Sequence, residues 1–269
     1  MNAKRIGIFD SGMGGLTVMR ALAARLPGES FVYLGDTARL PYGTKSAETV
    51  RRYALQASRA LVARGVKLVV VACNTASVSL PALEEALAPL PVIGVILPGA
   101  DAAAAAAPQG PIAVIATEGT VNGGAYVKAI HARVPGAAVM QQACPLFVPM
   151  TEEGLIEGPI VEAVAHRYLD PLLSGMSRPR CLLLGCTHYP VLAPVIAKLA
   201  PDVVLVDSAV TTADAVARLL GDANLANDGA IVPPRFLVTD APERFARVGE
   251  IFFGRAIDPE AVKLMDLQS

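Results

Sequence analysis

The sequence predicts an α/β fold built on open parallel β-sheets. Short, continuous runs of apolar residues end in small or polar side chains, and stretches with helical spacing follow them. Continuous apolar runs are typical of strands that are buried on both faces, as in parallel sheets covered by helices. The runs that predict strands lie at 6–9, 31–34, 66–71, 92–96, 112–115, 181–184, 203–206 and 236–239.

Crossover helices are predicted between these strands, because the intervening stretches have the length and apolar spacing of amphipathic helices. They lie at 16–26, 46–64, 158–173 and 190–199. The alanine-rich run 102–107 predicts a connecting helix, since alanine has the highest helix propensity. Asp240 followed by Pro242 predicts an N-cap and an early helical proline for a last helix.

The two halves of the chain resemble each other weakly. Residues 6–11 resemble 112–117, and residues 69–75 resemble 182–188. In both halves, one buried strand pattern ends in a cysteine that polar residues follow. This match favours an internal duplication over the chance similarity of any two buried strands.

Length and composition indicate a two-domain globular protein. The chain has 269 residues, of which 53% are hydrophobic and 17% charged, so it can bury a large core. Its net charge of -1 gives no electrostatic signature of nucleic-acid or membrane binding. A small polar substrate fits this composition better than a polyanion. Candidate hinges between the two domains lie at 98–99 and 207–208.

The cysteine content and the N-terminus predict a cytoplasmic protein with reduced thiols. The four cysteines lack the density of a disulfide-stapled secreted domain. No apolar signal-peptide segment precedes the first predicted strand. The long uncharged region 102–117 is broken by Pro108, Gly110 and Pro111, so it is a poor membrane span.

Cys73 and Cys186 are the strongest candidates for chemistry. Polar side chains follow each of them, namely Asn74, Thr75, Thr187 and His188. Ligands of open α/β sheets bind outside the carboxyl ends of the strands, so each thiol is expected at the functional edge of its own half. If the halves face each other, the thiols flank one cleft. A single buried cysteine is more often structural, but the matched placement of two favours a shared role.

Two thiols placed in this way suit racemisation at the α-carbon of an amino acid. One base removes the α-proton from one face, and a conjugate acid delivers a proton to the other. The unperturbed thiol pKa of about 8.5 lies near working pH. A thiolate needs nearby hydrogen-bond donors, which Asn74, Thr75 and Thr187 are placed to supply.

A glycine loop at 12–15 follows Asp10 and Ser11 at the end of the first predicted strand. Thr17 takes the place of the last glycine of a dinucleotide-binding loop, and no Gly-Lys-Ser/Thr element is present, so no nucleotide site is predicted. The backbone N–H groups of the loop are expected to approach a substrate carboxylate. Asp10 either binds the substrate ammonium or shuttles a proton, or it is a simple helix cap.

Two further groups of polar residues have open roles. Tyr42 and Gly43 lie in a loop that either closes over the substrate or forms a plain turn. Thr117 and Thr120 follow the matching strand of the second half, where their hydroxyls either bind a side-chain carboxylate or cap a helix.

His188 stands two residues after Cys186, close enough to influence the protonation of that thiol. Glu152 and Glu153 are expected in a loop that faces either substrate or solvent. A zinc site needs three or four ligands, and no Cys-x-x-Cys is present, so no metal site is predicted.

Four motifs resemble those of the bacterial glutamate racemase family, and they follow in order over nearly the whole chain. They are Gly7-Ile8-Phe9-Asp10-Ser11-Gly12-Met13-Gly14-Gly15-Leu16, Gly35-Asp36-Thr37 with Pro41-Tyr42-Gly43, Ala72-Cys73-Asn74-Thr75-Ala76, and Gly185-Cys186-Thr187-His188-Tyr189-Pro190. No departure occurs at these motifs, whereas the tail after about residue 225 matches only loosely.

The resemblance implies two α/β lobes with the active site between them, the first lobe comprising residues 1–97 and 208–269 and the second 98–207. It implies that Cys73 deprotonates D-glutamate with assistance from Asp10. It implies likewise that Cys186 deprotonates L-glutamate with assistance from His188. It further implies no cofactor or metal, a supply of D-glutamate for peptidoglycan, and a homodimer as in many members. The residues that the resemblance implies for substrate binding are Asp10, Ser11, Tyr42, Gly43, Asn74, Thr75, Thr187 and His188.

Three other functions remain open at this point. A related racemase acting on aspartate or a hydantoin would use the same chemistry with a different side-chain pocket. A two-lobed binding protein that closes on a small anion has no need of a thiol at both sheet edges. A thiol-redox enzyme is disfavoured because the paired cysteines are distant in sequence and no Cys-x-x-Cys occurs.

Overall fold

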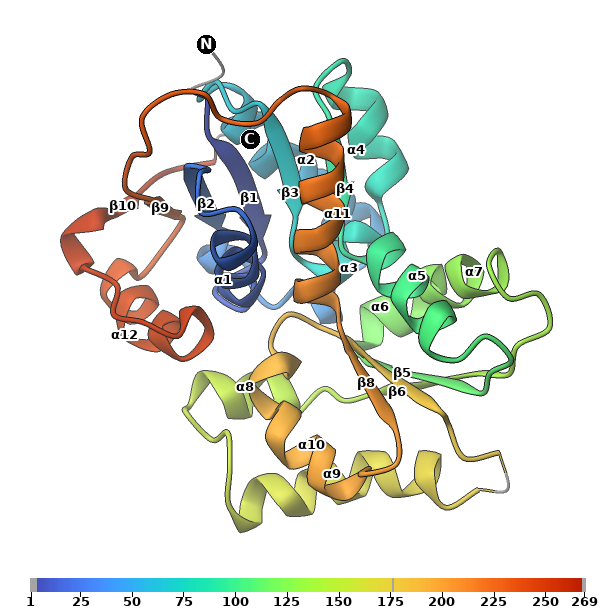
Figure 1. Cartoon of the computed structure of the whole chain (residues 1–269). Helices are drawn as coiled ribbons and strands as arrows, with labels where there is room; N and C mark the ends of the chain where they lie inside the picture. The colour runs from blue at the N-terminus through green and yellow to red at the C-terminus, as the bar shows by residue number, and fades with distance from the viewer. Residues whose placement is uncertain (1–3, 176, 268–269) are drawn as a thin grey trace.

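The protein contains two parallel β-sheets with helices packed on them (Figure 1). The structure is a computed structural model that describes residues 4–175 and 177–267, so the ends of the predicted first lobe, 1–3 and 268–269, lie outside it. The six-stranded sheet has the order β10-β9-β2-β1-β3-β4 and the four-stranded sheet the order β6-β5-β7-β8. The strands of the first sheet are β1 (Ile6–Asp10), β2 (Phe31–Gly35), β3 (Leu68–Val71), β4 (Val92–Gly94), β9 (Arg235–Val238) and β10 (Val262–Leu264). Those of the second are β5 (Ile112–Ala116), β6 (Val139–Ala143), β7 (Cys181–Gly185) and β8 (Val204–Asp207).

Helices connect the strands in both sheets. The α-helices are α1 (Leu16–Arg25), α2 (Ala47–Val62), α3 (Asn74–Ser77), α4 (Leu80–Leu87), α5 (Ile96–Ala106), α6 (Glu118–Asn122), α7 (Ala125–His131), α8 (Phe147–Glu152), α9 (Pro159–Leu173), α10 (Ala193–Leu199), α11 (Ser208–Asp222) and α12 (Pro242–Phe253). Short 3₁₀ helices lie at Thr37–Arg39, Tyr42–Thr44, Tyr189–Leu192 and Pro259–Ala261. None of the helices within the described ranges is long and apolar enough to cross a bilayer.

The two sheets share one strand order, which confirms the predicted α/β class and its pseudo-symmetry. The order β2-β1-β3-β4 in the first sheet corresponds to β6-β5-β7-β8 in the second, and every strand pair is parallel. The strands β3 and β7, which precede the two candidate cysteines, therefore occupy equivalent places. In each sheet all strands are parallel, so their carboxyl ends lie at the same edge. The residues that follow β3 and β7 therefore lie at the edge of their own sheet where ligands of α/β folds bind.

The structure corrects several boundaries predicted from the sequence. The strand expected at 92–96 ends at Gly94, and residues 98–99 lie in the first turns of α5 rather than in a hinge loop. Ala241, with a φ of 47°, takes the N-cap position that Asp240 was expected to fill, although α12 does begin at Pro242. Strands β6 and β10 were not predicted, because β6 is half-buried with two glutamines and β10 has only three residues.

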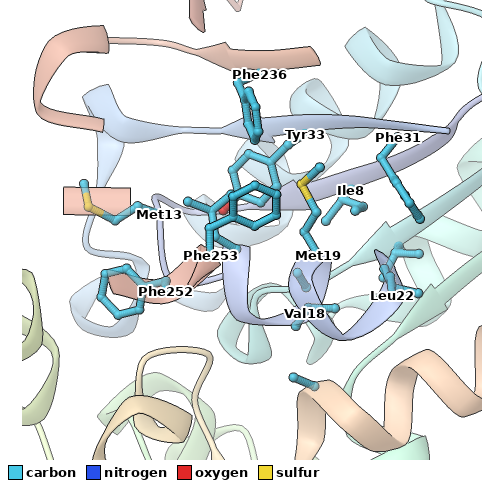
Figure 2. Packing of buried hydrophobic residues seen from close by; sticks show 14 of the residues in the cluster. Ile8, Met13, Val18, Met19, Leu22, Phe31, Tyr33, Phe236, Phe252 and Phe253 are labelled. Atoms are coloured by element: carbon cyan, nitrogen blue, oxygen red, sulfur yellow. The ribbon is translucent and has the colours of Figure 1, made fainter. Parts of the chain in front are cut away.

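The C-terminal segment returns to the first sheet after β8. Helix α11 packs against α1, and strand β9 pairs with β2 (Figure 1). Aromatic side chains hold this segment in place. The ring centroid of Phe236 of β9 lies 5.7 Å from that of Phe253 of α12 (Figure 2). The ring centroid of Tyr33 of β2 lies 5.7 Å from that of Phe245. The segment therefore completes the core of the first sheet.

A buried ion pair fastens the connection between α11 and β9. Lys67 Nζ lies 2.7 Å from Glu29 Oε2, and the two side chains are only 1% and 5% exposed. Lys67 also donates to the carbonyl of Leu225 at 2.6 Å, and Glu29 Oε1 accepts from the N–H of Asn227 at 2.7 Å. Each charge thus binds both its partner and the backbone of the returning segment.

Breaking this pair on one side should destabilise the protein strongly. Glu29→Gln leaves the Lys67 ammonium buried without its counter-ion, and we expect a loss of about 3–5 kcal/mol in the free energy of unfolding. The exposed pair of Arg25 and Asp214 is the control, and Asp214→Asn should cost less than about 1 kcal/mol. Urea unfolding followed by circular dichroism measures both, and equal losses would contradict the role given to the buried pair.

Candidate active site

The two candidate cysteines line one cavity, although they belong to different sheets. Cys73 follows β3 of the six-stranded sheet and Cys186 follows β7 of the four-stranded sheet. The cavity is narrow, about 40 Å³. Of the other residues predicted from the sequence, it is lined by Ser11, Tyr42, Gly43, Asn74, Thr75, Thr187 and His188. Residues 12, 40, 41, 117, 148 and 152 complete its wall.

Cys73 lies at the first turn of α3, where its sulfur has two polar neighbours. Its Sγ accepts the N–H of Ala76 at 3.4 Å and lies 3.4 Å from the hydroxyl of Ser11. Burial and the nearby Asp10 carboxylate raise the pKa of Cys73 to about 11, and the bonds to Ser11 and Ala76 oppose that rise. The thiol is therefore the stable form in the substrate-free site, with donors ready for the thiolate.

Cys186 has a different partner, the imidazole of His188. Cys186 Sγ lies 3.8 Å from His188 Nδ1, and His188 Nε2 lies 3.1 Å from Glu152 Oε1. Burial raises the pKa of Cys186 well above its usual range, against the backbone N–H of His188, which lowers it. When Nε2 carries the proton that binds Glu152, Nδ1 is free to accept the proton of Cys186.

Glu152 belongs to this arrangement, which corrects its predicted place in a loop. It is the last residue of α8, it is 9% exposed, and Glu153 forms the C-cap. Burial alone would raise the pKa of Glu152, but bonds to His188 and to Arg244 of α12 hold it below its ordinary value. Arg244 lies 3.3 Å from Glu152 Oε2 and 3.3 Å from Glu153 Oε1. The C-terminal segment thus reaches the residues that orient His188.

Asp10 lies behind the cavity wall. It is completely buried, and its Oδ2 accepts the N–H of Gly12 at 2.9 Å, whereas its Oδ1 has no hydrogen-bond partner. Burial raises the pKa of Asp10, and His188 and the loop N–H groups oppose that rise. Because Asp10 does not line the cavity, its contact with substrate stays a prediction. The charge of its carboxylate raises the pKa of Cys73.

The glycine loop lets α1 approach the Cys186 loop closely. A Cβ on Gly14 would lie 2.6 Å from Thr187 Oγ1 and closer still to the His188 ring. Thr17 Oγ1 donates to the carbonyl of Thr187 at 2.9 Å. Thr17, the residue that departs from the dinucleotide-binding pattern, therefore joins the two halves of the site by a hydrogen bond.

Threonine hydroxyls join the halves on another side of the cavity. Thr75 Oγ1 lies 2.9 Å from Thr117 Oγ1 and 3.2 Å from Thr120 Oγ1, and Thr117 Oγ1 also caps α6. A Cβ on Gly43 would lie 2.8 Å from Thr117 Cβ. Thr117 thus caps α6 and also lines the cavity, whereas Thr120 lies behind the wall and does neither.

The remaining predicted residues play supporting parts. The hydroxyl of Tyr42 donates to Asp36, and Tyr42 is one of the residues that line the cavity. Cys144 and Cys181 are buried and do not line the cavity. Within residues 4–175 and 177–267, no cluster of three or more His, Cys, Asp or Glu side chains is placed to hold a metal ion.

Comparison with known proteins assigns the class to which this fold and site belong. The family model for Asp/Glu/Hydantoin racemase matches residues 6–216, which is most of the chain. The glutamate racemase of Syntrophus aciditrophicus (strain SB) is 46% identical over 254 residues, 94% of this chain and 93% of its own. The chain therefore belongs to the Asp/Glu/hydantoin racemase family and, within it, to the glutamate racemases.

Solved structures of relatives agree with this assignment. Glutamate racemase from Francisella tularensis, in complex with D-glutamate, has a TM-score of 0.92 and 38% identity, covering 99% of both chains. The Escherichia coli enzyme, in complex with L-glutamate and the activator UDP-MurNAc-ala, has a TM-score of 0.76 and 29% identity, covering 93% of this chain and 95% of its own. The fold of these racemases is thus the fold of this chain.

Gly14→Ala should reduce racemase activity at least about tenfold, because the added methyl group must displace His188 and Thr187. Gly28→Ala is the control, since a Cβ there meets nothing within 4 Å. Initial rates by circular dichroism measure both variants. If Gly14→Ala keeps the activity of the parent, the close approach of α1 to His188 has no functional weight.

The pKa of Cys73 predicts slow alkylation at neutral pH. Only the thiolate reacts, so a pKa of about 11 should make the rate with iodoacetamide rise about tenfold per pH unit up to about pH 10. The measurement uses the Cys186→Ala variant without substrate and follows the Cys73 peptide by mass spectrometry. A rate that levels off near pH 9, as for an unperturbed thiol with a pKa of about 8.5, would contradict the effect of burial.

Proposed function

We propose that this protein interconverts L-glutamate and D-glutamate by a two-base mechanism without a cofactor, using Cys73 and Cys186. The observation that carries the proposal is the presence of both thiols in one cavity, each supplied by a different sheet. Glutamate is the substrate that the names of the relatives give, and the Francisella tularensis relative binds its D form. The pairing of fold, cavity and thiols supports the same reaction here.

The proton balance of the proposed reaction requires the thiols to be in opposite states. For D-glutamate, the Cys73 thiolate takes the α-proton while the Cys186 thiol gives its proton to the opposite face, and L-glutamate is formed. For L-glutamate, Cys186 takes the proton and Cys73 gives one. The negative charge on Cys73 raises the pKa of Cys186, which favours one thiolate at a time.

Different groups assist the two thiols. Ser11 and the N–H of Ala76 are placed to stabilise the Cys73 thiolate, and Asp10 would take part in its proton exchange. On the other side, His188 is placed to accept the proton of Cys186, with Glu152 holding the imidazole. General acid–base assistance of this kind contributes about 10²–10⁴-fold in rate.

Neutral donors are proposed to bind the substrate carboxylates. Among the residues that the structure describes, no lysine or arginine lines the cavity. Besides the two thiols, Tyr42, Glu152 and His188, its polar side chains are the hydroxyls and amide of Ser11, Asn74, Thr75, Thr117 and Thr187. Hydrogen bonds to a charged acceptor are stronger than neutral ones, so several such donors can replace a cation.

The remaining elements of the proposal concern the protein in the cell. The lobes would comprise residues 1–97 with 208–269, and 98–207, and opening between them would admit glutamate to the narrow cavity. The protein would act in the cytoplasm as a homodimer and supply D-glutamate for peptidoglycan. The activator UDP-MurNAc-ala in the Escherichia coli complex supports a link to cell-wall synthesis.

Cys73→Ala and Cys186→Ala should each lower kcat by on the order of 10³-fold or more, since each removes one of two obligatory proton-transfer groups. In D2O, Cys73→Ala should exchange the α-proton of L-glutamate faster than that of D-glutamate, and Cys186→Ala should show the reverse preference. Proton NMR of the α-position measures the exchange. The same preference in both variants would overturn the assignment of thiols to enantiomers.

The controls are Cys144→Ala and Cys181→Ala, which remove buried thiols outside the cavity and should cost only stability. L-aspartate tests the substrate. Faster turnover of L-aspartate than of L-glutamate would replace glutamate in the proposal while leaving the two-base mechanism in place.

A further inference from the structure

We propose that Tyr126 is a positioning residue, which fixes the side-chain amide of Asn74 so that its NH₂ group faces the substrate cavity and binds a substrate carboxylate. The inference rests on the proposed function, because it takes the cavity between Cys73 and Cys186 as the place where glutamate binds. It adds a residue that does not touch the substrate and that the sequence did not single out.

Asn74 presents an unsatisfied donor at the cavity. It follows Cys73 as the first residue of α3, it is 2% exposed, and it lines the cavity. Its Oδ1 accepts the hydroxyl of Tyr126 at 2.6 Å, whereas its Nδ2 is buried without a hydrogen-bond partner. Buried polar groups in native proteins are almost always paired, so an unpaired amide NH₂ beside a cavity indicates a ligand acceptor.

Tyr126 is held rigidly behind the cavity wall. It belongs to α7, it is 0% exposed, and it does not line the cavity. Its ring packs where two glycines leave room: a Cβ on Gly185 would lie 3.0 Å from Tyr126 Cε2, and one on Gly99 would lie 3.4 Å from Cε1. The ring therefore rests between β7 and α5, and its hydroxyl reaches across to α3, which follows the other sheet.

This contact decides which end of the amide the substrate meets. An amide has one accepting oxygen and one NH₂ group with two donors, and a hydroxyl that donates to the oxygen leaves the NH₂ free. A carboxylate accepts hydrogen bonds and cannot donate them when ionised. Without Tyr126, the amide is free to turn and present its oxygen to the carboxylate, which is repulsive.

The amide carries more weight here because no lysine or arginine is among the described residues that line the cavity. Of its other side-chain donors, the hydroxyls of Thr75 and Thr117 already bind each other, which leaves those of Ser11 and Thr187 beside the amide. Asn74 NH₂ is therefore a donor group, with two N–H bonds, that a carboxylate can engage without breaking an existing bond. The hydrogen bond between Tyr126 and Asn74 also joins the two halves of the protein.

The experiment compares Tyr126→Phe with the parent enzyme and with Tyr168→Phe. Tyr168 is the matched control, a buried tyrosine of α9 whose hydroxyl accepts the N–H of Leu146 at 3.3 Å, away from the cavity. Tyr126→Phe should raise KM for both glutamate enantiomers about tenfold or more, as expected for a lost hydrogen bond to a charged group, and change kcat less than about threefold. Tyr168→Phe should leave KM unchanged.

Two further variants test the mechanism of the effect. Asn74→Ala should raise KM similarly, and the Asn74→Ala/Tyr126→Phe double variant should be no worse than Asn74→Ala alone, because Tyr126 acts through Asn74. Asn74→Asp keeps an acceptor for Tyr126 but replaces the donor by oxygen, so it should raise KM more than Asn74→Ala does. This variant does not depend on the folding of Tyr126→Phe.

The outcomes separate the two proposals. A KM of Tyr126→Phe within about twofold of the parent value, additive effects in the double variant, or near-parental binding by Asn74→Asp would each overturn the role of Tyr126. If the parent enzyme racemises glutamate but the variants give any of these contradicting results, the role of Tyr126 is refuted and the proposed function stands. A parent enzyme that does not racemise glutamate refutes the proposed function itself.

Discussion

Burial of two thiols in one cavity is the constraint on which the rest of the site depends. Removing a thiol from water disfavours its charged form, so burial raises the pKa of both Cys73 and Cys186. In the proposed mechanism, proton abstraction by either sulfur therefore needs a local arrangement that makes the thiolate accessible. The hydrogen-bond donors around the cavity would meet this need.

The two sulfurs meet this need in unequal ways, although the sheets that carry them have the same strand order. Cys73 has a hydroxyl and a backbone N–H as neighbours, whereas Cys186 has an imidazole that a glutamate and an arginine hold in place. The shared strand order therefore supplies equivalent positions, whereas the surroundings of the two sulfurs differ. A reaction that runs in both directions does not require identical groups, only two proton donors and acceptors of comparable strength.

The sequence predicted the fold class and the cysteine pair because both depend on local pattern. Buried runs identify strands, and the placement of Cys73 and Cys186 after two of them identifies a shared edge. The contacts of Glu152 with His188, and of Tyr126 with Asn74, join residues that are distant in the chain. The first depends on how α8 packs against the residues after β7, and the second on how the two sheets dock; no local spacing records either. Strand β6 was not predicted because its two glutamines break the apolar pattern. Its pairing with β5 is a contact between segments distant in sequence.

The late return of the chain to the first sheet has a consequence for biosynthesis. Strands β9 and β10 lie after residue 234, yet β9 pairs with β2 and completes a sheet whose other strands precede residue 95. A chain emerging from the ribosome can assemble β5 to β8 as a unit, because they are continuous in sequence, before the first sheet has all its strands. Until the segment that contains β9 is translated, the edge of β2 stays unpaired.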